Sequence, residues 1–324
     1  MSTSEKILDF ISKNNQASGK QLSDYLGVIT ARAVRKQLKN LLDKGILRKV
    51  GKPPKVYYLL KEDKQEYFTR EIDKKTKKII NDRYLFISPT GESKPGWEGF
   101  LSWCQKTKQD PIKTSKDYIS TLKKFDSFRK DGLIDGMQKM QNTFKDVFLD
   151  KLFYLDFYSI ERFGKTKLGQ MLLYAKQSQN VRLMRELVKE INPKVISIID
   201  KYDIDGVLFV PPTVKREIQF MRELERMLKL PIRNISVGKI RTDIVIPQKT
   251  LSKLVDRIEN ARHTIVVEDT GSFRNVLIID DAVGSGATIN ETAKQIKKKG
   301  LARGKIIGLA ITGSFKGFDV ISEV

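Results

Sequence analysis

The sequence predicts an α/β protein whose C-terminal half forms a parallel sheet flanked by helices. The reason is the apolar pattern after about residue 151, where short apolar runs alternate with helical stretches. Runs without alternating polar residues are typical of parallel strands that are covered on both faces. The length of 324 residues also suffices for two or three domains, so the sheet need not extend over the whole chain. We expect a small domain over 1–61, a linker and mainly helical segment over 62–150, and the sheet domain over 151–324.

The expected strands of the sheet domain are short apolar runs. They are residues 206–210, 232–237, 264–267, 276–279 and 306–312. Helices are expected over 167–191 and 215–229. This alternation suits a parallel sheet, because parallel neighbours are usually joined by a helical crossover.

The first 61 residues predict three short helices followed by a hairpin. The first helix covers residues 5–14, which place apolar side chains on one face. The signals at the other helix ends are the capping box Ser18–Gln21, the cap Thr30 and the terminators Gly27 and Gly45. The apolar runs 46–50 and 56–60 then form the two hairpin strands. The residues between them, 51–55, give the hairpin a basic tip.

The third of these helices has an apolar stripe on one side and a basic stripe on the other. Such a helix is suited to lie in the major groove of DNA or against its phosphates. The candidate DNA-binding residues are Arg32, Arg35, Lys36 and Lys39 on the helix and Lys52 and Lys55 at the hairpin tip. Residues 1–61 hold 13 Lys and Arg against 4 Asp and Glu, a net charge of +9.

This order of elements resembles bacterial winged helix-turn-helix repressor domains. The resemblance implies a winged-helix domain that binds double-stranded DNA. A winged helix that serves only protein contacts is the alternative.

Composition supports a polyanionic partner. The whole chain has 61 Lys and Arg against 39 Asp and Glu, a net charge of +22. Basic residues that neutralise phosphates release condensed counterions, although a basic surface that is merely solvated is the alternative. A single cysteine, Cys104, excludes an internal disulfide and a cysteine-cluster zinc site. No run approaches the roughly 20 apolar residues of a membrane span, and the N-terminus lacks a secretory apolar core, so we expect a cytoplasmic protein without membrane contact.

The middle segment carries little chemistry. Residues 67–81 are typical of a solvated helix or linker, 88–99 of a loop, and 116–150 of an amphipathic helix. Between them lies an aromatic cluster, Trp97, Phe100, Leu101 and Trp103. We interpret this cluster as a small hydrophobic core rather than as a platform for stacking bases. No function is assigned to this segment, and the only histidine, His263, is interpreted as structural.

The chemistry is concentrated in the run Val276–Thr288. A buried strand is expected to end at Asp280 and Asp281, after which the chain turns through a glycine-containing loop into a helix that starts near Ile289. Glycines let backbone amides approach a phosphate, and the positive end of the helix faces the same anion. The expected phosphate-binding residues are Val283, Gly284, Ser285, Gly286, Ala287 and Thr288. The two carboxylates can accept hydrogen bonds from the hydroxyls of a ribose.

Two other phosphate-binding motifs do not match this run. A Walker loop requires a lysine after its last glycine, and a dinucleotide fingerprint requires three glycines before the helix. Instead, the 13 residues resemble the signature that binds 5-phosphoribosyl-1-pyrophosphate (PRPP) in type I phosphoribosyltransferases. The resemblance implies a type I phosphoribosyltransferase-like fold for residues 151–324, with PRPP as ligand.

A weaker resemblance links most of residues 151–324 to the competence-associated ComF-type branch of that superfamily. The residues that carry it are the run Val210-Pro-Pro-Thr-Val-Lys-Arg216, then Pro247, Gln248, Leu251, Arg257 and Asn260, and Lys176. Two features depart from that branch. Arg216-Glu-Ile-Gln-Phe-Met221 replaces the usual Arg-Gly-Phe-Asn-Gln, which puts efficient pyrophosphate handling in doubt, and a winged helix stands where a zinc ribbon is common.

The resemblance also implies a set of roles. Mg²⁺ chelates the pyrophosphate and the ribose hydroxyls, without a dedicated protein cluster for the metal. Asp280 and Asp281 are the candidate catalytic residues. The candidate pyrophosphate loop consists of Pro212, Thr213, Lys215 and Arg216. The candidate flap residues are Lys239 and Arg241.

Three functions remain open from the sequence. The first is an enzyme that transfers phosphoribosyl to a nucleobase or related nitrogen nucleophile. The second is a regulator that resembles Gram-positive purine repressors and senses PRPP without catalysis. The third is an accessory of DNA uptake or processing. Winged-helix regulators commonly dimerise, so a homodimer is a further expectation.

Overall fold

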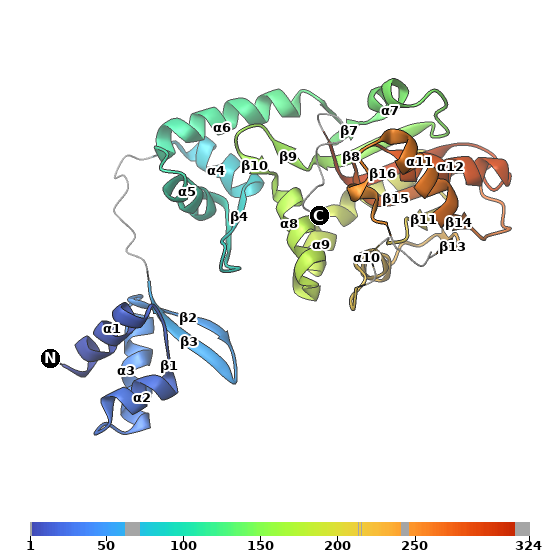
Figure 1. Cartoon of the computed structure of the whole chain (residues 1–324). Helices are drawn as coiled ribbons and strands as arrows, with labels where there is room; N and C mark the ends of the chain where they lie inside the picture. The colour runs from blue at the N-terminus through green and yellow to red at the C-terminus, as the bar shows by residue number, and fades with distance from the viewer. Residues whose placement is uncertain (1, 62–71, 213, 215, 241–245, 315–324) are drawn as a thin grey trace. The chain divides into compact units, whose positions relative to one another are not determined.

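The computed structural model describes residues 2–61, 72–212, 214, 216–240 and 246–314. The chain divides into two compact units, Met1–Glu71 and Ile72–Val324 (Figure 1). Residues 72–150 therefore pack within the same unit as the C-terminal sheet. Each unit is described by itself.

The first unit has three helices and a three-stranded antiparallel sheet of order β1-β3-β2. Its elements are α1 (Thr3–Asn14), β1 (Ala17–Ser18), α2 (Gly19–Leu26), α3 (Ala31–Asp43), β2 (Leu47–Lys52) and β3 (Lys55–Leu60). The predicted caps are present, because the side chains of Ser18 and Thr30 accept hydrogen bonds from the third residue of the following helices. The hairpin tip is shorter than predicted. Strand pairing continues to Lys52 and Lys55, so that only two residues connect the strands.

The core of the first unit lies between the three helices and the sheet. Ile7 and Ile11 of α1, Leu22 of α2, and Val34 and Leu38 of α3 are buried there. The periodic apolar positions of α3 therefore face inward, as its sequence pattern predicts. The basic stripe of the same helix is left on the outside.

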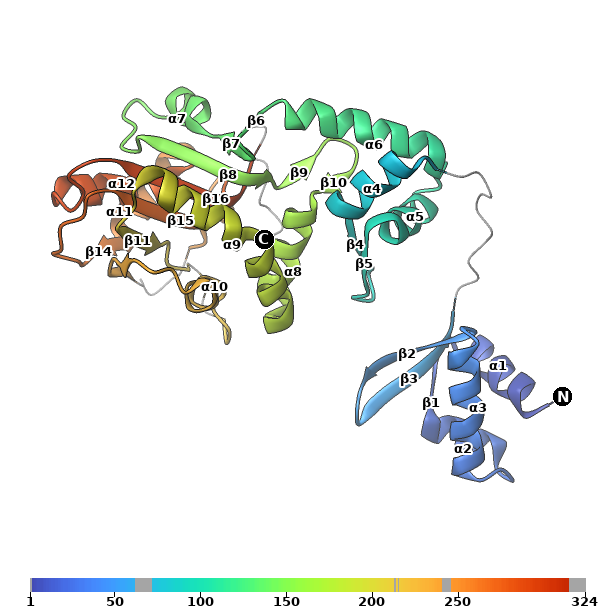
Figure 2. The same cartoon turned by 180° about the vertical axis from the view of Figure 1, so that it is seen from behind.

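The second unit is built on a seven-stranded sheet of order β12-β11-β15-β16-β8-β7-β6. The strands are β6 (Arg129–Lys130), β7 (Leu133–Asp135), β8 (Lys151–Phe157), β11 (Gly206–Phe209), β12 (Arg233–Asn234), β15 (Val276–Val283) and β16 (Ile306–Gly313). The five strands from β12 to β8 are parallel, whereas β7 and β6 are added antiparallel. The sheet is thus mixed rather than purely parallel. Figure 2 shows β7 and β6 beyond β8.

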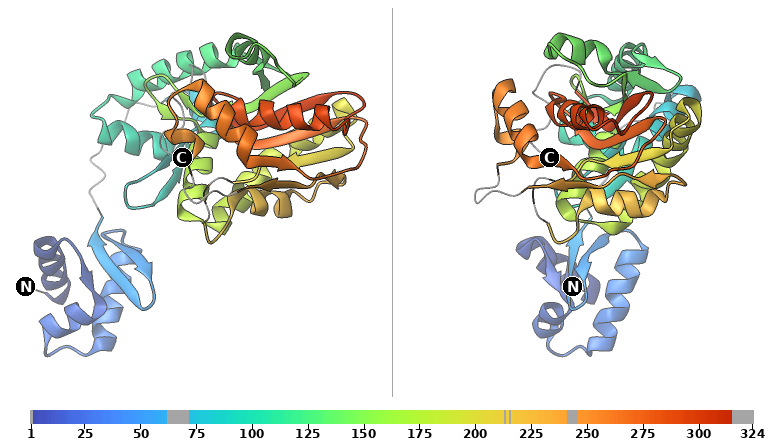
Figure 3. Two further views of the ribbon diagram at one scale, coloured as in Figure 1. Left: turned by 45° about the vertical axis from the view of Figure 1, so that its right-hand side comes forward. Right: turned by 90° about the vertical axis from the view of Figure 1, so that its right-hand side faces the viewer.

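Helices cover both faces of this sheet (Figure 3). One face packs on α8 (Lys167–Ser178), α9 (Val181–Tyr202) and α10 (Phe220–Leu228). The opposite face packs on α12 (Ala287–Lys298) and α7 (Met137–Thr143), with α11 (Leu254–Thr264) against α12. The continuous apolar runs of β11, β15 and β16 follow from this arrangement, because alternate side chains enter the two cores. Leu277 and Ile279 face one core and Val276 and Ile278 the other.

The remaining elements lie around this framework. They are α4 (Lys74–Arg83), β4 (Leu85–Ile87), β5 (Ser93–Pro95), α5 (Gly96–Lys106), α6 (Pro111–Asp126), β9 (Ser159–Ile160), β10 (Gly164–Lys165), β13 (Val237–Lys239), the 3₁₀ turn η1 (Gln248–Thr250) and β14 (Ile265–Val267). The predicted strand 264–267 is thus present as β14, but it pairs with β13 rather than joining the seven-stranded sheet.

Several predicted boundaries are wrong. The helix expected over 116–150 ends at Asp126, and a hairpin follows in which Asp131 and Gly132 both have positive φ. An Asp-Gly pair favours a two-residue turn of this kind. The loop expected over 88–99 is interrupted by β5 and by the start of α5, and the helix expected from 215 begins only at Phe220. β8, an interior strand of the sheet, was not predicted.

The aromatic cluster of the middle segment is a core, as predicted. Phe100 is fully buried, with its ring centroid 5.2 Å from that of Tyr84 and 5.6 Å from that of Tyr118. Trp97 and Trp103 pack against the same core from positions that are partly buried.

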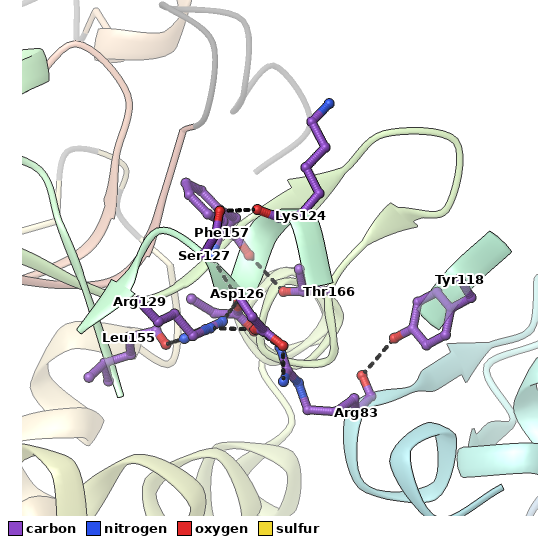
Figure 4. A network of polar contacts seen from close by, with 10 residues as sticks. Arg83, Tyr118, Lys124, Asp126, Ser127, Arg129, Leu155, Phe157 and Thr166 are labelled. Carbon is purple, nitrogen blue, oxygen red and sulfur yellow. Dashed lines mark hydrogen bonds and ion pairs between the residues drawn. The ribbon is translucent and has the colours of Figure 1, made fainter. Parts of the chain in front are cut away.

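A network of charged groups attaches this helical region to β8 (Figure 4). The guanidinium of Arg83 lies 2.9 Å from a carboxylate oxygen of Asp126, and Arg129 Nε lies 3.0 Å from the same carboxylate. Arg129 also forms an ion pair with Asp156, which lies near the end of β8, and donates a hydrogen bond to the carbonyl of Leu155. Burial raises the pKa of Asp156, and the charges of Arg129 and Arg83 oppose the rise.

Candidate functional site

The two adjacent aspartates lie near the carboxyl end of the central strand β15. Pairing between β15 and β16 continues through Asp280 and Ala282 to Val283, so the strand ends later than predicted. Both neighbours of β15 in the sheet, β11 and β16, are parallel to it. Ligands of parallel α/β sheets commonly bind at the carboxyl ends of the strands. The position of the aspartates therefore favours a ligand site.

The residues after β15 form a short loop that ends in a helix N-terminus. α12 begins at Ala287, two residues before the predicted start, and Gly286 caps it with φ +87°. The backbone amide of Ala287 donates to Ser285 Oγ at 3.3 Å, and that of Asn290 to the carbonyl of Gly286 at 3.0 Å. The first amides of a helix have no partner within the helix and carry the positive end of its dipole. This end can bind an anion.

The aspartates and this loop line one cavity of about 520 Å³. All of the predicted catalytic and phosphate-binding residues, Asp280, Asp281 and 283–288, are among its lining residues. The segment after β11 contributes Pro212 and Arg216, α8 contributes Lys176, and the region around η1 contributes Gln248 and Arg257. Groups predicted from four separate parts of the sequence thus meet at one site.

The carboxylates occupy a partly buried environment with cations nearby. Burial and the charge of Asp281 raise the pKa of Asp280 to about 7, and Lys176 and Lys239 oppose this rise. The amide of Asp281 donates to Asp280 Oδ1 at 2.8 Å and also opposes it. Lys176 Nζ lies 2.5 Å from Asp281 Oδ2. The pair can therefore hold a proton near neutral pH and can accept hydrogen bonds from hydroxyl groups.

The candidate pyrophosphate loop is described only in part. Pro212 and Arg216 line the cavity, whereas Thr213 and Lys215 lie outside the described residues. The guanidinium of Arg216 donates to the carbonyl of Lys176, and the side chain of Gln219 donates to the carbonyl of Arg216 at 3.0 Å. These contacts hold Arg216 beside the lysine that pairs with Asp281.

The candidate flap is also described in part, because Arg241 lies outside the described residues. Lys239 ends β13, and its ammonium is close enough to Asp280 for their charges to interact, although Lys239 is not among the residues that line the cavity. Burial lowers the pKa of Lys239.

The region around η1 is held together by hydrogen bonds of its own. Gln248 Nε2 donates to the carbonyl of Arg257 at 2.8 Å, and Arg257 Nε donates to the carbonyl of Leu251 at 2.7 Å. These three residues line the cavity. Asn260, from the same predicted motif, is not among the lining residues, and His263 is exposed on the last turn of α11.

One group that touches the loop 283–288 was not predicted from the sequence. Lys139 of α7 donates a hydrogen bond to the carbonyl of Gly284 at 2.5 Å. The two residues are 145 positions apart, and α7 falls in the segment to which no function was assigned. Only tertiary packing brings this lysine to the loop.

The candidate DNA-binding residues whose side chains are described lie on α3 and β3. Arg32, Arg35, Lys36 and Lys39 are exposed on the side of α3 opposite its buried stripe, and Lys55 is exposed at the start of β3. The side chain of Lys52 lies outside the described part of the chain. Five of the six candidate DNA-binding side chains are therefore accessible.

Among the described residues, no helix is long and apolar enough to cross a membrane. In the same part of the chain, no group of three or more His, Cys, Asp or Glu side chains is placed to hold a metal ion. Comparison of the chain with protein-family models gave no match, and comparison with curated protein sequences gave none either.

Proposed function

We propose that the second unit is a type I phosphoribosyltransferase-like domain that binds PRPP and transfers its phosphoribosyl group to a nucleobase or related nitrogen nucleophile. The observation that carries the proposal is that two adjacent carboxylates and a glycine-rich loop before a helix N-terminus line the same cavity. A sugar phosphate needs this combination, because its phosphate requires amide donors and its hydroxyls require acceptors.

Each part of PRPP has a complementary group in the cavity. The 5′-phosphate fits the loop 283–288 and the first turn of α12, and the ribose hydroxyls fit Asp280 and Asp281. The pyrophosphate then extends toward Arg216, which supplies a positive charge at the cavity wall. Transfer breaks the bond from C1 to pyrophosphate and forms a bond from C1 to the nitrogen of the acceptor; pyrophosphate leaves, and the acceptor nitrogen releases its proton. Positive groups near the departing oxygens stabilise the charge that develops there.

The carboxylates also fit the Mg²⁺ ion that accompanies PRPP in such enzymes. Mg²⁺ prefers oxygen ligands and usually binds one or two protein carboxylates together with phosphate oxygens of the substrate. Asp280 and Asp281 would supply such oxygens next to the ribose hydroxyls and pyrophosphate that are expected to chelate the ion. When bound, the ion neutralises part of the pyrophosphate charge.

A PRPP-sensing regulator of transcription is the second candidate function. It is favoured by the exposed basic side chains on α3 of the first unit, which we interpret as a winged-helix domain that binds double-stranded DNA. It is also favoured by the segment after Arg216. In place of the Gly-Phe-Asn of the resembling family, this segment has Glu217, Ile218 and Gln219.

Calorimetry with PRPP and Mg²⁺ tests the proposal, and pyrophosphate release on addition of a panel of nucleobases separates the two candidates. We expect PRPP binding at micromolar to millimolar concentration, lost in Asp280→Asn with Asp281→Asn, and release with at least one base. Binding without release across the panel, together with a PRPP-dependent change in DNA affinity, would favour the regulator. Absence of PRPP binding at millimolar concentration contradicts both.

A further inference from the structure

A segment distant in sequence contacts the proposed phosphate loop, residues 283–288. α7 and the residues that follow it, together 137–148, contact the loop and the first turn of α12 at three points. The first contact is the hydrogen bond from Lys139 Nζ to the carbonyl of Gly284 at 2.5 Å. Lys139 is partly buried, and burial lowers its pKa to about 8. An ammonium kept there costs desolvation, so its position calls for an explanation beyond packing.

The geometry of the peptide group gives the hydrogen bond a consequence. In a trans peptide the carbonyl and the N–H of the next residue point in opposite directions. Because Lys139 binds the carbonyl of Gly284, the N–H of Ser285 is directed away from Lys139. Gly284 and Ser285 both line the cavity, and the lining residues among the described part of the chain come from elements other than α7. The Ser285 amide therefore points away from Lys139, in a loop whose residues line the cavity.

The other two contacts fix the same loop sterically and through hydrogen bonds. A Cβ at Gly286 would lie 2.4 Å from Met140 Sδ, so α7 approaches the loop as closely as a glycine permits. Asn290, which is 2% exposed, accepts from the amide of Phe148 at 2.9 Å and donates to the carbonyl of Asp146 at 3.0 Å. The loop and helix α12 are therefore held by 137–148, a segment none of whose residues is among those that line the cavity.

We propose that Lys139 is a positioning residue of the phosphate site, which orients the Gly284–Ser285 peptide and places a positive charge behind it, so that the Ser285 amide binds the phosphate of the ligand. The inference rests on the proposed function for the identity of the ligand. Its physical basis is that a cation bound to a carbonyl polarises the peptide and strengthens the opposite N–H as a donor.

Substitution of Lys139 by Met tests the proposal, because Met retains most of the side-chain volume and removes the charge. We expect Lys139→Met to weaken the binding of PRPP and of ribose 5-phosphate about tenfold. Lys145→Met is the matched control, since Lys145 is exposed in the same segment, and its affinity should equal that of the wild type.

A chemical rescue separates charge from packing. In Lys139→Cys, alkylation with 2-bromoethylamine restores an ammonium on a chain close to the length of lysine, and the only native cysteine, Cys104, is fully buried. We expect the alkylated protein to recover most of the affinity. An unchanged affinity of Lys139→Met, or a loss that alkylation does not restore, would overturn the proposal.

Hydrogen exchange of the ligand-free protein distinguishes failure of this inference from failure of the proposed function. We expect amides within 283–290 to exchange faster in Lys139→Met than in Lys145→Met. If the wild type binds no PRPP, the proposed function fails, and exchange then decides whether Lys139 orders the loop. If exchange is also unchanged, the positioning role is wrong.

Discussion

The ammonium of Lys176 lies 2.5 Å from the carboxylate of Asp281, and both side chains are largely buried, at 19% and 17% exposure. The pair joins α8 to β15 at the wall of the cavity, where a ribose hydroxyl would compete with the lysine for the same carboxylate. The lysine is therefore part of the site as well as of the fold, and both roles can be tested.

Lys176→Met should destabilise the protein, because it leaves a partly buried carboxylate without its cation. We expect a loss of about 1–3 kcal/mol in the free energy of unfolding, measured with urea. It should also raise the pKa of Asp280 further, since Lys176 lowers it. Lys167→Met is the control on the same helix, where a more exposed pair with Glu190 at 2.9 Å predicts a change below about 1 kcal/mol. Equal losses in the two variants would mean that the Lys176–Asp281 pair stabilises the protein no more than the more exposed Lys167–Glu190 pair does.

Asp280→Asn should change how stability depends on pH. The pKa of Asp280 is raised from 3.8 to about 7, so between these values the folded state holds a proton that the unfolded state releases. The contribution of protonated Asp280 to the free energy of unfolding is therefore full below about pH 4, and it is lost as the pH rises through about 7. The variant should therefore be the more stable protein at pH 8, by about 1–3 kcal/mol. The exposed Asp82→Asn serves as control, and a wild type that is the more stable at pH 8 contradicts the assignment.

PRPP binding should depend on pH through the same group. A carboxylate accepts hydrogen bonds from ribose hydroxyls better when ionised, so affinity should increase as the pH rises through about 7. Calorimetry with PRPP and Mg²⁺ from pH 6 to pH 8 measures this. In Asp280→Asn the affinity should be at least tenfold lower. The increase with pH should also disappear, whereas persistence of the wild-type pH profile in the variant would assign it to another group.

Gly286→Ala should be more costly than Gly300→Ala, although both glycines have positive φ. At Gly300 a Cβ meets nothing within 4 Å, whereas at Gly286 it meets Met140 Sδ at 2.4 Å, and Met140 is fully buried. Gly300→Ala should cost about 1 kcal/mol of stability for the backbone alone, and Gly286→Ala about 1–3 kcal/mol more than that. In a Met140→Ala background this excess should shrink, as a double-mutant cycle in urea can measure. A constant excess would exclude the contact with Met140 as its cause.

Arg129→Met should destabilise the attachment of the helical region to β8. The substitution leaves Asp156 buried without its nearest cation, which should cost about 3 kcal/mol. The control is Arg162→Met, where the arginine is 46% exposed and pairs with Asp117 at 2.6 Å, and the expected loss is below about 1 kcal/mol. Thermal and urea unfolding measure both variants. If Arg129→Met behaves like the control, the network in Figure 4 contributes little to stability.

Charge reversal on α3 should weaken DNA binding. Lys36→Glu with Lys39→Glu should reduce affinity for duplex DNA at least tenfold and lower the slope of log K against log salt by about 2, because two phosphate contacts are lost. Lys74→Glu with Lys77→Glu is the matched control, with the same spacing and charge change on the exposed side of α4. Loss of affinity to the same extent in both variants would indicate a response to net charge alone.

Local signals predicted the parts of the protein that short segments control. The capping box Ser18–Gln21, the cap Thr30, the inward stripe of α3 and the strand–loop–helix around Asp280 and Gly286 lie where their patterns indicate. Each depends on residues within a few positions of one another, since caps, helical faces and glycine turns are local in origin.

Features decided by contacts between distant segments were not predictable in the same way. The assignment of β14 to a separate ribbon, the antiparallel addition of β7 and β6, and the position of β8 inside the sheet depend on which strands pair. An apolar run does not specify which strand it pairs with. Residues 129–135, expected as part of a helix over 116–150, form the hairpin β6–β7 because they pair with one another and with β8.

The amino-acid sequence by itself determined the α/β class, the glycine-containing loop before α12 and the aspartates that precede it, because these are properties of continuous runs. Only the tertiary structure decided that Lys176 pairs with Asp281, that Lys139 lies behind Gly284, and that the loop after β11 faces the same cavity. These relationships join residues tens to more than a hundred positions apart. They arise because packing across the sheet brings distant segments together. Which charged groups become buried and which of them pair depends on that packing, and a local sequence pattern does not specify it.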